Sequence, residues 1–396
     1  MLSLLLVSCS MRFSTSALAI PDNKQVYEAL DVDGTAASVD LLSPQESGLP
    51  ARPCVEGHSV PSFYLLGPPK TGTTALAVQL KAQGIRYPLT LREQAHWVPW
   101  KESHFFSHAF PGEGINVSLL SWMHTDDGID ARLQWLRHFP SDCARGEDGD
   151  VQGDFSTTHF GHSGVASRIA AFHGPVLARR LTFAVVVRRP TDQLVSFFHH
   201  FCLGRSHPMI TACFGFTEPL LPFLNRSLLE HGSHTCSAPR PHEVPPTLCL
   251  TQYAARLREW LQSFAPRQFL LVPHTVLKDE DGMRSATHLV WGRLAATDEP
   301  DGTMHYSHKG NEAAPPPLIQ NSRASHLSMV EAVNLITDPV KRIQLRAASE
   351  AHDQAEATSL AYLLSQKLPE GLMVAGLPDE ECLPGDALAA WLVGVW

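Results

Sequence analysis

Short apolar runs and amphipathic segments alternate along the middle of the chain. Continuous apolar runs predict buried strands at 63–66, 181–187 and 269–272, and the β-branched residues of 181–187 are typical of a parallel strand. Apolar residues at helical spacing predict helices, which we place at 73–83, 130–139, 251–265, 281–294, 322–336 and 340–366. Gly84 follows the first of these helices and is placed to end it.

Composition and periodicity divide the chain into four parts. We expect a targeting segment at 1–19, a linker or stem at 20–60, one domain at 61–366 and a C-terminal tail at 367–396. Within the domain, 203–250 is rich in Pro, His and Cys, and it predicts a variable insertion or a substrate-facing loop. The end of the tail is apolar enough to dock on the domain.

A glycine-bearing loop joins the predicted strand 63–66 to the predicted helix 73–83, and residues 69–74 of this loop read PKTGTT. The start of a helix leaves backbone N–H groups unpaired and carries partial positive charge, so such a loop binds phosphate or sulfate. Lys70 supplies a full charge, and Gly72 lets the backbone approach an anion. The hydroxyl groups that can donate further hydrogen bonds belong to Thr71, Thr73 and Thr74.

This loop does not match the phosphate loop of nucleoside triphosphate enzymes. That motif places its lysine directly after the second glycine, whereas Lys70 precedes Gly72 in the sequence GPPKTGTT at 67–74. The stretch instead resembles the 5′-phosphosulfate loop of sulfotransferases that use 3′-phosphoadenosine 5′-phosphosulfate (PAPS). A helix N-terminus that binds no ligand is the alternative interpretation.

A second segment, KESHFF at 101–106, resembles the stretch that carries the catalytic glutamate in heparan-type sulfotransferases. Glu102 falls on that position, and a partly buried carboxylate can take the proton that an acceptor loses as it attacks sulfur. His104 can orient the acceptor or share the proton, and Lys101 can pair with Glu102 or with sulfate. The alternative is a strand edge with Phe105 and Phe106 in the core and Glu102 in solvent.

A third segment follows the predicted strand 181–187. Ligands of open α/β sheets bind at the carboxyl ends of strands, so Arg188 and Ser196 can hold one phosphate together. The segment resembles the 3′-phosphate motif of sulfotransferases, R-D-P-x-x-R-x-x-S, with Arg188 and Ser196 at the functional positions. Arg189 replaces the aspartate of that motif, and we expect a surface charge there; Gln193 replaces its second arginine, so local pairing must differ.

Two further positions bear on the substrates. The segment Gly153–Thr158 resembles one that lines the acceptor cleft of related enzymes, where Phe155 stands in place of a frequent lysine and argues against a strongly anionic sugar. A strand that ends in a polar turn is the alternative interpretation of this segment. Lys309 lies in a His-Lys-Gly loop that resembles the one closing over the nucleotide in this family, and a solvated linker lysine is the alternative.

Four segments in family order therefore resemble a PAPS-dependent sulfotransferase: the PKTGTT loop, KESHFF, the Arg188–Ser196 segment, and the aromatic helix 251–265 with the strand after it. The resemblance implies a three-layer α/β fold with a central parallel sheet flanked by helices. It also implies transfer of a sulfuryl group from PAPS to a hydroxyl or amine, without a metal. A P-loop nucleotide kinase and a non-catalytic protein that binds PAPS or glycan remain the alternatives.

The composition limits the classes of molecule that we expect the protein to bind. The chain has 396 residues, 44% of them hydrophobic, which is enough for one large core. A formal charge of −9 and a pI near 6.1 argue against nucleic acid and against a very highly charged polyanionic acceptor. The KESHFF stretch is closest to the heparan and glucosaminyl branch of the family, so a carbohydrate is the preferred acceptor. The spacing of His231, His234 and Cys236 fits no zinc pattern, so we expect no metal.

The N-terminal segment points to the secretory pathway. The first 21 residues contain no Asp or Glu, and Ala17-Leu18-Ala19 resembles a signal cleavage site, so we expect a Golgi-lumenal or secreted protein; an organelle transit peptide is the alternative. No apolar stretch is long enough to predict a membrane span. Four of the eight cysteines lie between 202 and 249, where two disulfides would suit a lumenal protein, and glycosylation sequons begin at Asn116 and Asn225.

Overall fold

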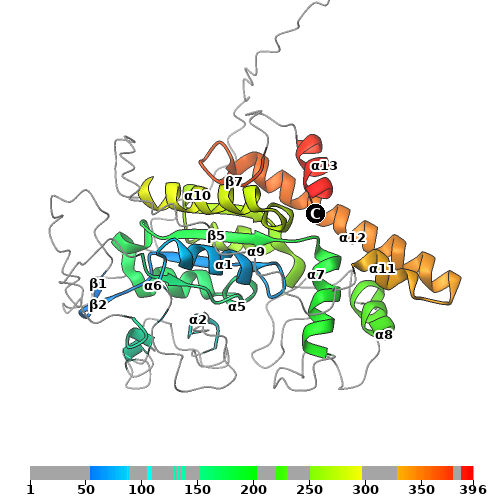
Figure 1. The fold of residues 1–396 in the computed structure, drawn as a ribbon, viewed down its shortest axis with the longest axis horizontal. Helices are drawn as coiled ribbons and strands as arrows, with labels where there is room; N and C mark the ends of the chain where they lie inside the picture. The colour runs from blue at the N-terminus through cyan, green and yellow to red at the C-terminus, as the bar shows by residue number, and fades with distance from the viewer. Residues whose placement is uncertain are drawn as a thin grey trace, which may run out of the picture.

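The protein is built around a five-stranded parallel sheet (Figure 1). The structure, a computed structural model, describes residues 54–86, 88, 105–108, 129, 132–133, 135–139, 151–202, 220–230, 250–296, 328–377 and 385–395. The strands of this sheet are β3 (Phe63–Leu66), β4 (Gly153–Asp154), β5 (Thr182–Val187), β6 (Phe269–Pro273) and β7 (Met373–Val374). They lie in the order β4-β3-β5-β6-β7, and two further strands, β1 (Cys54–Val55) and β2 (His58–Ser59), form a separate antiparallel hairpin.

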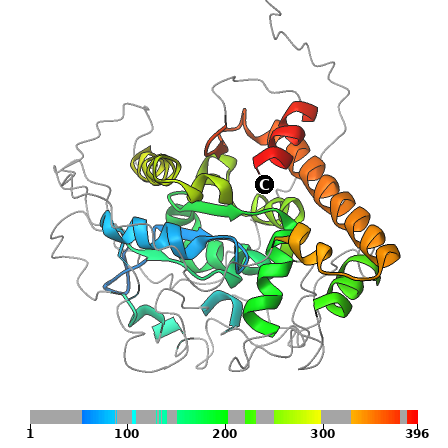
Figure 2. The same cartoon turned by 45° about the vertical axis from the view of Figure 1, so that its right-hand side comes forward.

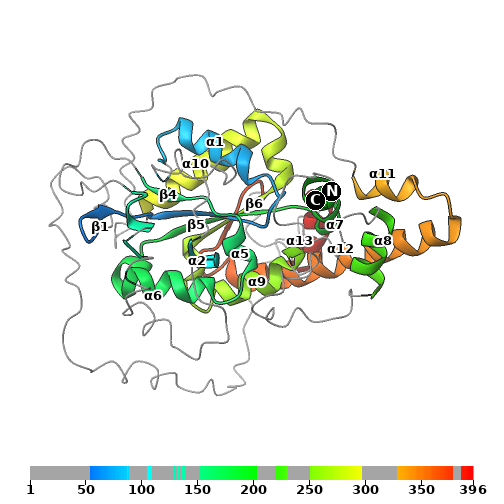
Figure 3. The same cartoon turned by 90° about the horizontal axis from the view of Figure 1, so that it is seen from below.

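Helices cover both faces of the sheet (Figure 3). The helices are α1 (Thr73–Ala82), α2 (Phe105–His108), α5 (Thr158–Gly161), α6 (Val165–Ala178), α7 (Pro190–Phe197), α8 (Leu220–Leu224), α9 (Tyr253–Trp260), α10 (Glu280–Ala296), α11 (Met329–Asn334), α12 (Pro339–Lys367) and α13 (Gly385–Val395). Shorter helical turns are η2 (Phe198–Cys202), η4 (Asn225–Glu230), η6 (Pro266–Gln268) and η7 (His274–Lys278). None of the helices that the structure describes is long and apolar enough to cross a membrane.

Alternate residues of each central strand enter two separate cores. Phe183 and Val185 of β5 pack with α6, α9, α12 and α13, whereas Ala184 and Val186 pack with α1 and α10. Every residue of β3, β5 and β6 is buried, as expected of parallel strands with helices on both faces. The predicted α/β fold with a central parallel sheet flanked by helices is therefore confirmed.

The strand order places a topological switch between β3 and β5. The chain passes from β3 to β4 on one side of it, and then crosses to β5 on the other side, so the connections leave in opposite directions. In parallel α/β sheets a crevice for ligands opens at such a point, beyond the carboxyl ends of the strands. The segments that follow β3 and β5 begin at Gly67 and Arg188, which are the two segments predicted to bind phosphate.

The structure also extends beyond the predicted limits of regular structure. The hairpin β1–β2 lies within the range predicted as a linker or stem, and β7 and α13 lie within the predicted tail 367–396. Strand β7 pairs with β6, and α13 packs against α12, the long helix along one side of the molecule in Figure 2. The sheet is therefore completed by residues that follow the predicted end of the domain.

Candidate functional site

The loop between β3 and α1 has a backbone that its neighbours constrain closely. Gly67 has a φ of 139°, and a Cβ atom added there would lie 2.8 Å from the carbonyl oxygen of Val186 on β5. Gly72 has a φ of 107°, and an added Cβ would lie 2.9 Å from Cδ2 of His274. These two positions require glycine because both the dihedral angle and the space exclude a side chain. The loop therefore lies directly against the ends of β5 and β6.

Lys70 adopts a conformation that non-glycine residues rarely take. Its φ is 75°, in the left-handed region, which costs of order 1 kcal/mol and persists only where surrounding contacts hold it. One of those contacts comes from Arg188, whose Nη1 donates to the carbonyl oxygen of Lys70 at 3.1 Å. The guanidinium of Arg188 thus contacts the backbone of Lys70, so the two segments predicted to bind phosphate meet at the same edge of the sheet.

The threonines of the loop divide into inward and outward residues. The Thr71 hydroxyl is fully buried and donates to the carbonyl oxygen of Pro68 at 2.9 Å, so this side chain shapes the loop. Thr73 is also buried, whereas Thr74 is exposed. No side chain caps the N-terminus of α1 at Gly72, and its first turn holds no acidic residue. The start of α1 is therefore suited to an anion.

Arg188 directly follows β5, and Ser196 lies on α7. Burial lowers the pKa of Arg188 from its ordinary value, while Asp192 and Tyr253 act in the opposite direction. The Ser196 hydroxyl is buried and has no hydrogen-bond partner in the structure. A buried polar atom without a partner is costly, and an incoming oxygen atom would satisfy it.

Gln193 and Tyr253 form a further connection to the loop, and neither was predicted as a site residue. The amide Nε2 of Gln193 donates to the carbonyl oxygen of Pro69 at 3.1 Å, and the Tyr253 hydroxyl donates to Oε1 of Gln193 at 2.6 Å. The backbone N–H of Arg188 donates to the same hydroxyl at 3.3 Å. Gln193 therefore bonds both to the loop and to Tyr253.

His274 is a further residue that the sequence did not reveal as part of the site. It begins η7 directly after β6, with its ring against Gly72. Burial lowers the pKa of His274 to about 3, and the positive charges of Arg188 and Lys278 act in the same direction. The ring is therefore neutral near pH 7, when one nitrogen donates and the other accepts. Its position after a buried strand of the sheet is the only sequence signal that pointed to it.

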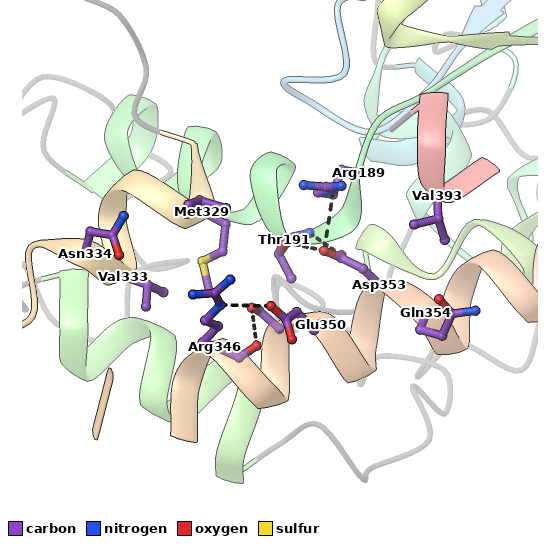
Figure 4. Close-up of a pocket in the computed structure, with 12 residues that line it drawn as sticks. Arg189, Thr191, Met329, Val333, Asn334, Arg346, Glu350, Asp353, Gln354 and Val393 are labelled. Atoms are coloured by element: carbon purple, nitrogen blue, oxygen red, sulfur yellow. Dashed lines mark hydrogen bonds and ion pairs between the residues drawn. The ribbon is translucent and has the colours of Figure 1, made fainter. Parts of the chain in front are cut away.

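Arg189 has a different environment from the expected surface charge. Its side chain is 31% exposed, and its Nε lies 3.8 Å from Oδ2 of Asp353 on α12. Both residues line a pocket of about 270 Å³ between α7, α11, α12 and α13 (Figure 4). The prediction of a plain surface charge was wrong because α12 packs across the start of α7, which the local sequence does not indicate.

The other side of the switch point is dominated by buried aromatic rings. Phe105 and Phe106 of α2 pack with Trp135 and Phe172, so both lie in the core, and Nη1 of Arg168 donates to the carbonyl oxygen of Phe106. This segment is a helix, whereas the alternative interpretation had placed a strand edge here. Three predicted site residues, Glu102, His104 and Lys309, lie outside the described residues, as does Lys101.

The end of β4 is buried as well. Oδ1 of Asp154 accepts from the backbone N–H and the hydroxyl of Ser156, and Oδ2 lies 3.6 Å from Nε2 of His159. Phe155 is fully buried and packs edge-on against Phe63 in the core beneath α1. The interpretation of Phe155 as a cleft residue was therefore wrong. Its side chain points into the core beneath α1, whereas Phe105 and Phe106 lie in the other core. It carries no information about the charge of an acceptor.

Within the part of the chain that the structure describes, no cluster of three or more His, Cys, Asp or Glu residues could hold a metal ion. The described site instead offers cations, hydroxyl groups and a neutral imidazole around one loop. Such a set of groups suits an anionic ligand with hydrogen-bonding oxygens.

Comparison with known proteins gives matches among solved structures alone. No family model and no curated protein matches the sequence. A sulfotransferase from Alicyclobacillus acidocaldarius is 18% identical over 76% of this chain and 95% of its own, with a TM-score of 0.42. The sulfotransferase domain from the curacin biosynthetic pathway is 14% identical over 73% of this chain and 97% of its own, with a TM-score of 0.31. Both are sulfotransferases, but at these identities and TM-scores the likenesses do not set the activity or the substrates of this chain.

Proposed function

We propose that the protein is a sulfotransferase that takes a sulfuryl group from PAPS. The observation that supports this most is the contact between the PKTGTT loop and Arg188, in which Arg188 Nη1 lies 3.1 Å from the Lys70 carbonyl oxygen. Two segments that resemble the 5′-phosphate and 3′-phosphate motifs, and that lie 118 residues apart, thus meet at one switch point. One nucleotide with two phosphates would account for both.

The residues at this point fit such a donor. Ser196 offers a buried hydroxyl group without a partner, which a phosphate oxygen would satisfy. We assign Arg188 and Ser196 to the 3′-phosphate, and Lys70 with the start of α1 to the 5′-phosphate, where Gly72, Thr73 and Thr74 provide backbone N–H groups. The contribution of Thr71 comes from its backbone, because its hydroxyl already donates to Pro68.

The proposed reaction needs little covalent chemistry from the protein. The bound donor supplies a sulfuryl group whose sulfur is attacked by an acceptor hydroxyl or amine as the bond to the 5′-phosphate breaks. Lys70 would stabilise the charge that develops on the leaving phosphate. Glu102 would take the acceptor proton, His104 would orient the acceptor, and Lys309 would close on the nucleotide.

A carbohydrate is the acceptor that we propose, on the resemblance of KESHFF to the heparan and glucosaminyl branch. With Phe155 in the core, the remaining argument against an anionic sugar is the average charge of −9, which does not describe a local cleft. Passage through the secretory pathway, to the Golgi lumen or beyond, would supply both PAPS and glycans, and it remains a proposal. Small lipophilic molecules and proteins are the other acceptor classes to include in an assay.

Calorimetry tests the donor site directly. We expect the full chain to bind 3′-phosphoadenosine 5′-phosphate more tightly than Mg²⁺-ATP, with the affinity reduced about tenfold to a hundredfold in Lys70→Ala and Arg188→Ala. Lys341→Ala and Arg284→Ala change exposed side chains and serve as matched controls. Tighter binding of Mg²⁺-ATP would favour a nucleotide kinase and overturn the proposal.

Transfer of radiolabelled sulfate from PAPS to a panel of glycans, phenols and proteins then tests catalysis. Label in a glycan would support the proposed acceptor, and label in another class would correct it. Tight binding of the nucleotide without transfer to any class would identify a non-catalytic binding protein instead.

A further inference from the structure

Two successive carbonyl groups of the loop are bound by side chains from elsewhere in the fold. The Pro69 carbonyl accepts from Gln193 and the Lys70 carbonyl accepts from Arg188. Because Lys70 has a positive φ, the loop keeps this shape only while such contacts persist. The proposed function also assigns Arg188 to the nucleotide. Gln193 has no such assignment, and its described contacts are with the protein alone.

Gln193 performs two opposite hydrogen-bonding roles at once. Its Nε2 donates to Pro69, and its Oε1 accepts from Tyr253, in a region where both side chains are 1% exposed. A side-chain amide carries both a donor and an acceptor, whereas arginine, lysine and an ionised carboxylate each carry only one kind. Gln193, which replaces the second arginine of the motif, can therefore donate to Pro69 and accept from Tyr253 at the same time.

Helix α12 holds the two helices that carry this pair. Oε1 of Glu356 accepts from the backbone N–H of Ala254 at 2.7 Å, next to Tyr253 in the first turn of α9. Asp353, on the preceding turn of α12, accepts from the backbone N–H and the hydroxyl of Thr191 in the first turn of α7. Figure 4 shows Asp353 pointing from α12 toward Thr191 and Arg189. Helix α12 thus fixes the distance between Gln193 and Tyr253.

We propose that Gln193 and Tyr253 are positioning residues that shape the phosphate-binding loop without touching the nucleotide, and that α12 keeps their helices in place. This inference rests on the proposed function, in which the loop binds the 5′-phosphate. The loop then depends on a pair of residues that the phosphate motifs themselves do not contain. Weakening the pair lowers the affinity for the nucleotide even though every residue assigned to it remains.

Gln193→Glu gives the sharpest test, because the new carboxyl group has nearly the same shape. When ionised it cannot donate to Pro69, so we expect the Kd of 3′-phosphoadenosine 5′-phosphate to rise about tenfold or more at pH 8. When protonated it donates and accepts like the amide, so the deficit relative to wild type shrinks as the pH falls. The titratable groups on the neighbouring elements are present in both proteins, and the wild-type profile accounts for them; they are Lys70, Arg188, Asp192, Tyr253, His274, Asp353 and Glu356.

Tyr253→Phe removes one oxygen atom and keeps the test sharp if Gln193→Glu does not fold. We expect the Kd of 3′-phosphoadenosine 5′-phosphate to rise about fivefold in this variant. Since the two residues share one hydrogen bond, the double variant Gln193→Ala with Tyr253→Phe should raise the Kd by less than the product of the two single factors. Gln344→Glu and Tyr362→Phe change exposed residues on α12 and are the matched controls.

Calorimetry at pH 6 and pH 8, with thermal unfolding of each variant, decides the outcome. Weaker binding by both variants, recovery of Gln193→Glu at the lower pH and unchanged controls support the inference. Wild-type binding with no loss in either folded variant, or a loss that does not depend on pH in Gln193→Glu, overturns the inference alone. Failure of the wild type to bind the nucleotide overturns the proposed function together with it.

Discussion

The two sides of the switch point between β3 and β5 are built in different ways. On the side proposed to bind the donor, buried polar groups are hydrogen-bonded across 60 to 124 residues of sequence. This donor side comprises the loop 67–72, Arg188, Ser196, Gln193, Tyr253 and His274. On the side proposed to face the acceptor, which comprises the end of β4 with α2 and α5, Asp154 pairs with Ser156 two residues away, and aromatic rings fill the space. A buried hydrogen-bond network therefore holds the first side, whereas aromatic packing holds most of the second, with hydrogen bonds that span 51 and 62 residues of sequence.

The largest expected effects separate the proposed acid–base chemistry from the binding of the nucleotide. Glu102→Gln should lower kcat by about 10²–10⁴-fold and leave the Kd of 3′-phosphoadenosine 5′-phosphate nearly unchanged, because a base acts on the acceptor. Lys70→Ala should lower kcat by a similar factor and should also weaken the binding of the nucleotide. Sulfate transfer and calorimetry on the same preparations measure both quantities. Lost nucleotide affinity in Glu102→Gln would remove Glu102 from the role of base.

Gly67→Ala should destabilise the loop 67–72 by changing its backbone conformation. The added Cβ would meet the carbonyl oxygen of Val186 at 2.8 Å, and the φ of 139° is unfavourable for alanine, so we expect a loss of about 2–3 kcal/mol in the free energy of unfolding. Gly292→Ala on α10 has open space and an ordinary φ, so it should be neutral or stabilising by up to about 1 kcal/mol. Denaturant unfolding compares the two, and equal effects would contradict the described contact of the loop with β5.

Glu356→Gln tests how α12 supports the donor side. Burial raises the pKa of Glu356 to about 8. A raised carboxyl pKa favours the folded state fully below the unfolded value near 4.5, and this contribution is lost as the pH rises through 8. Glutamine keeps an oxygen for Ala254 and does not ionise, so the variant should be more stable than wild type at pH 9 by about 1–2 kcal/mol, with a smaller difference at pH 5. The exposed Glu350→Gln is the control; parallel pH profiles for wild type and Glu356→Gln would show that Glu356 is not buried as described.

Ser196→Ala should produce the smallest change and the most specific one. Its hydroxyl has no partner in the structure, so its loss should leave the melting temperature unchanged or slightly higher. The Kd of 3′-phosphoadenosine 5′-phosphate should rise about fivefold, since a phosphate oxygen loses one hydrogen bond. Ser365→Ala, at an exposed position of α12, should change neither quantity. A lower melting temperature without a change in Kd would indicate that Ser196 serves the fold.

The sequence predicts those features that short stretches determine. The buried runs place β3, β5 and β6 within one residue of their observed limits, and the helix after the PKTGTT loop begins at Thr73 as expected. Lys70 and Arg188 were assigned from motifs, and the switch-point topology explains why such distant segments meet. Local pattern and motif spacing carry this information because a strand, a loop and a helix N-terminus are local objects.

The features that the sequence did not reveal all depend on contacts between distant elements. His274 joins the site because β6 ends beside Gly72, and Gln193 has its role because Tyr253 on α9 lies against it. Phe155 was misassigned because its side chain enters the core beneath α1. Asp353 is a partner of Arg189 only because α12 crosses α7. Neither propensity nor spacing reports which of two faces a side chain takes when both are buried.

The central claim is that the loop and the start of α7 hold one nucleotide together. Hydrogen–deuterium exchange of the full chain, titrated with 3′-phosphoadenosine 5′-phosphate, measures both segments in one experiment. We expect exchange to slow in 67–76 and in 188–197 with the same midpoint concentration, and no comparable change in the hairpin β1–β2, which precedes the amino end of β3. Protection of only one segment, or two separate midpoints, would contradict the claim.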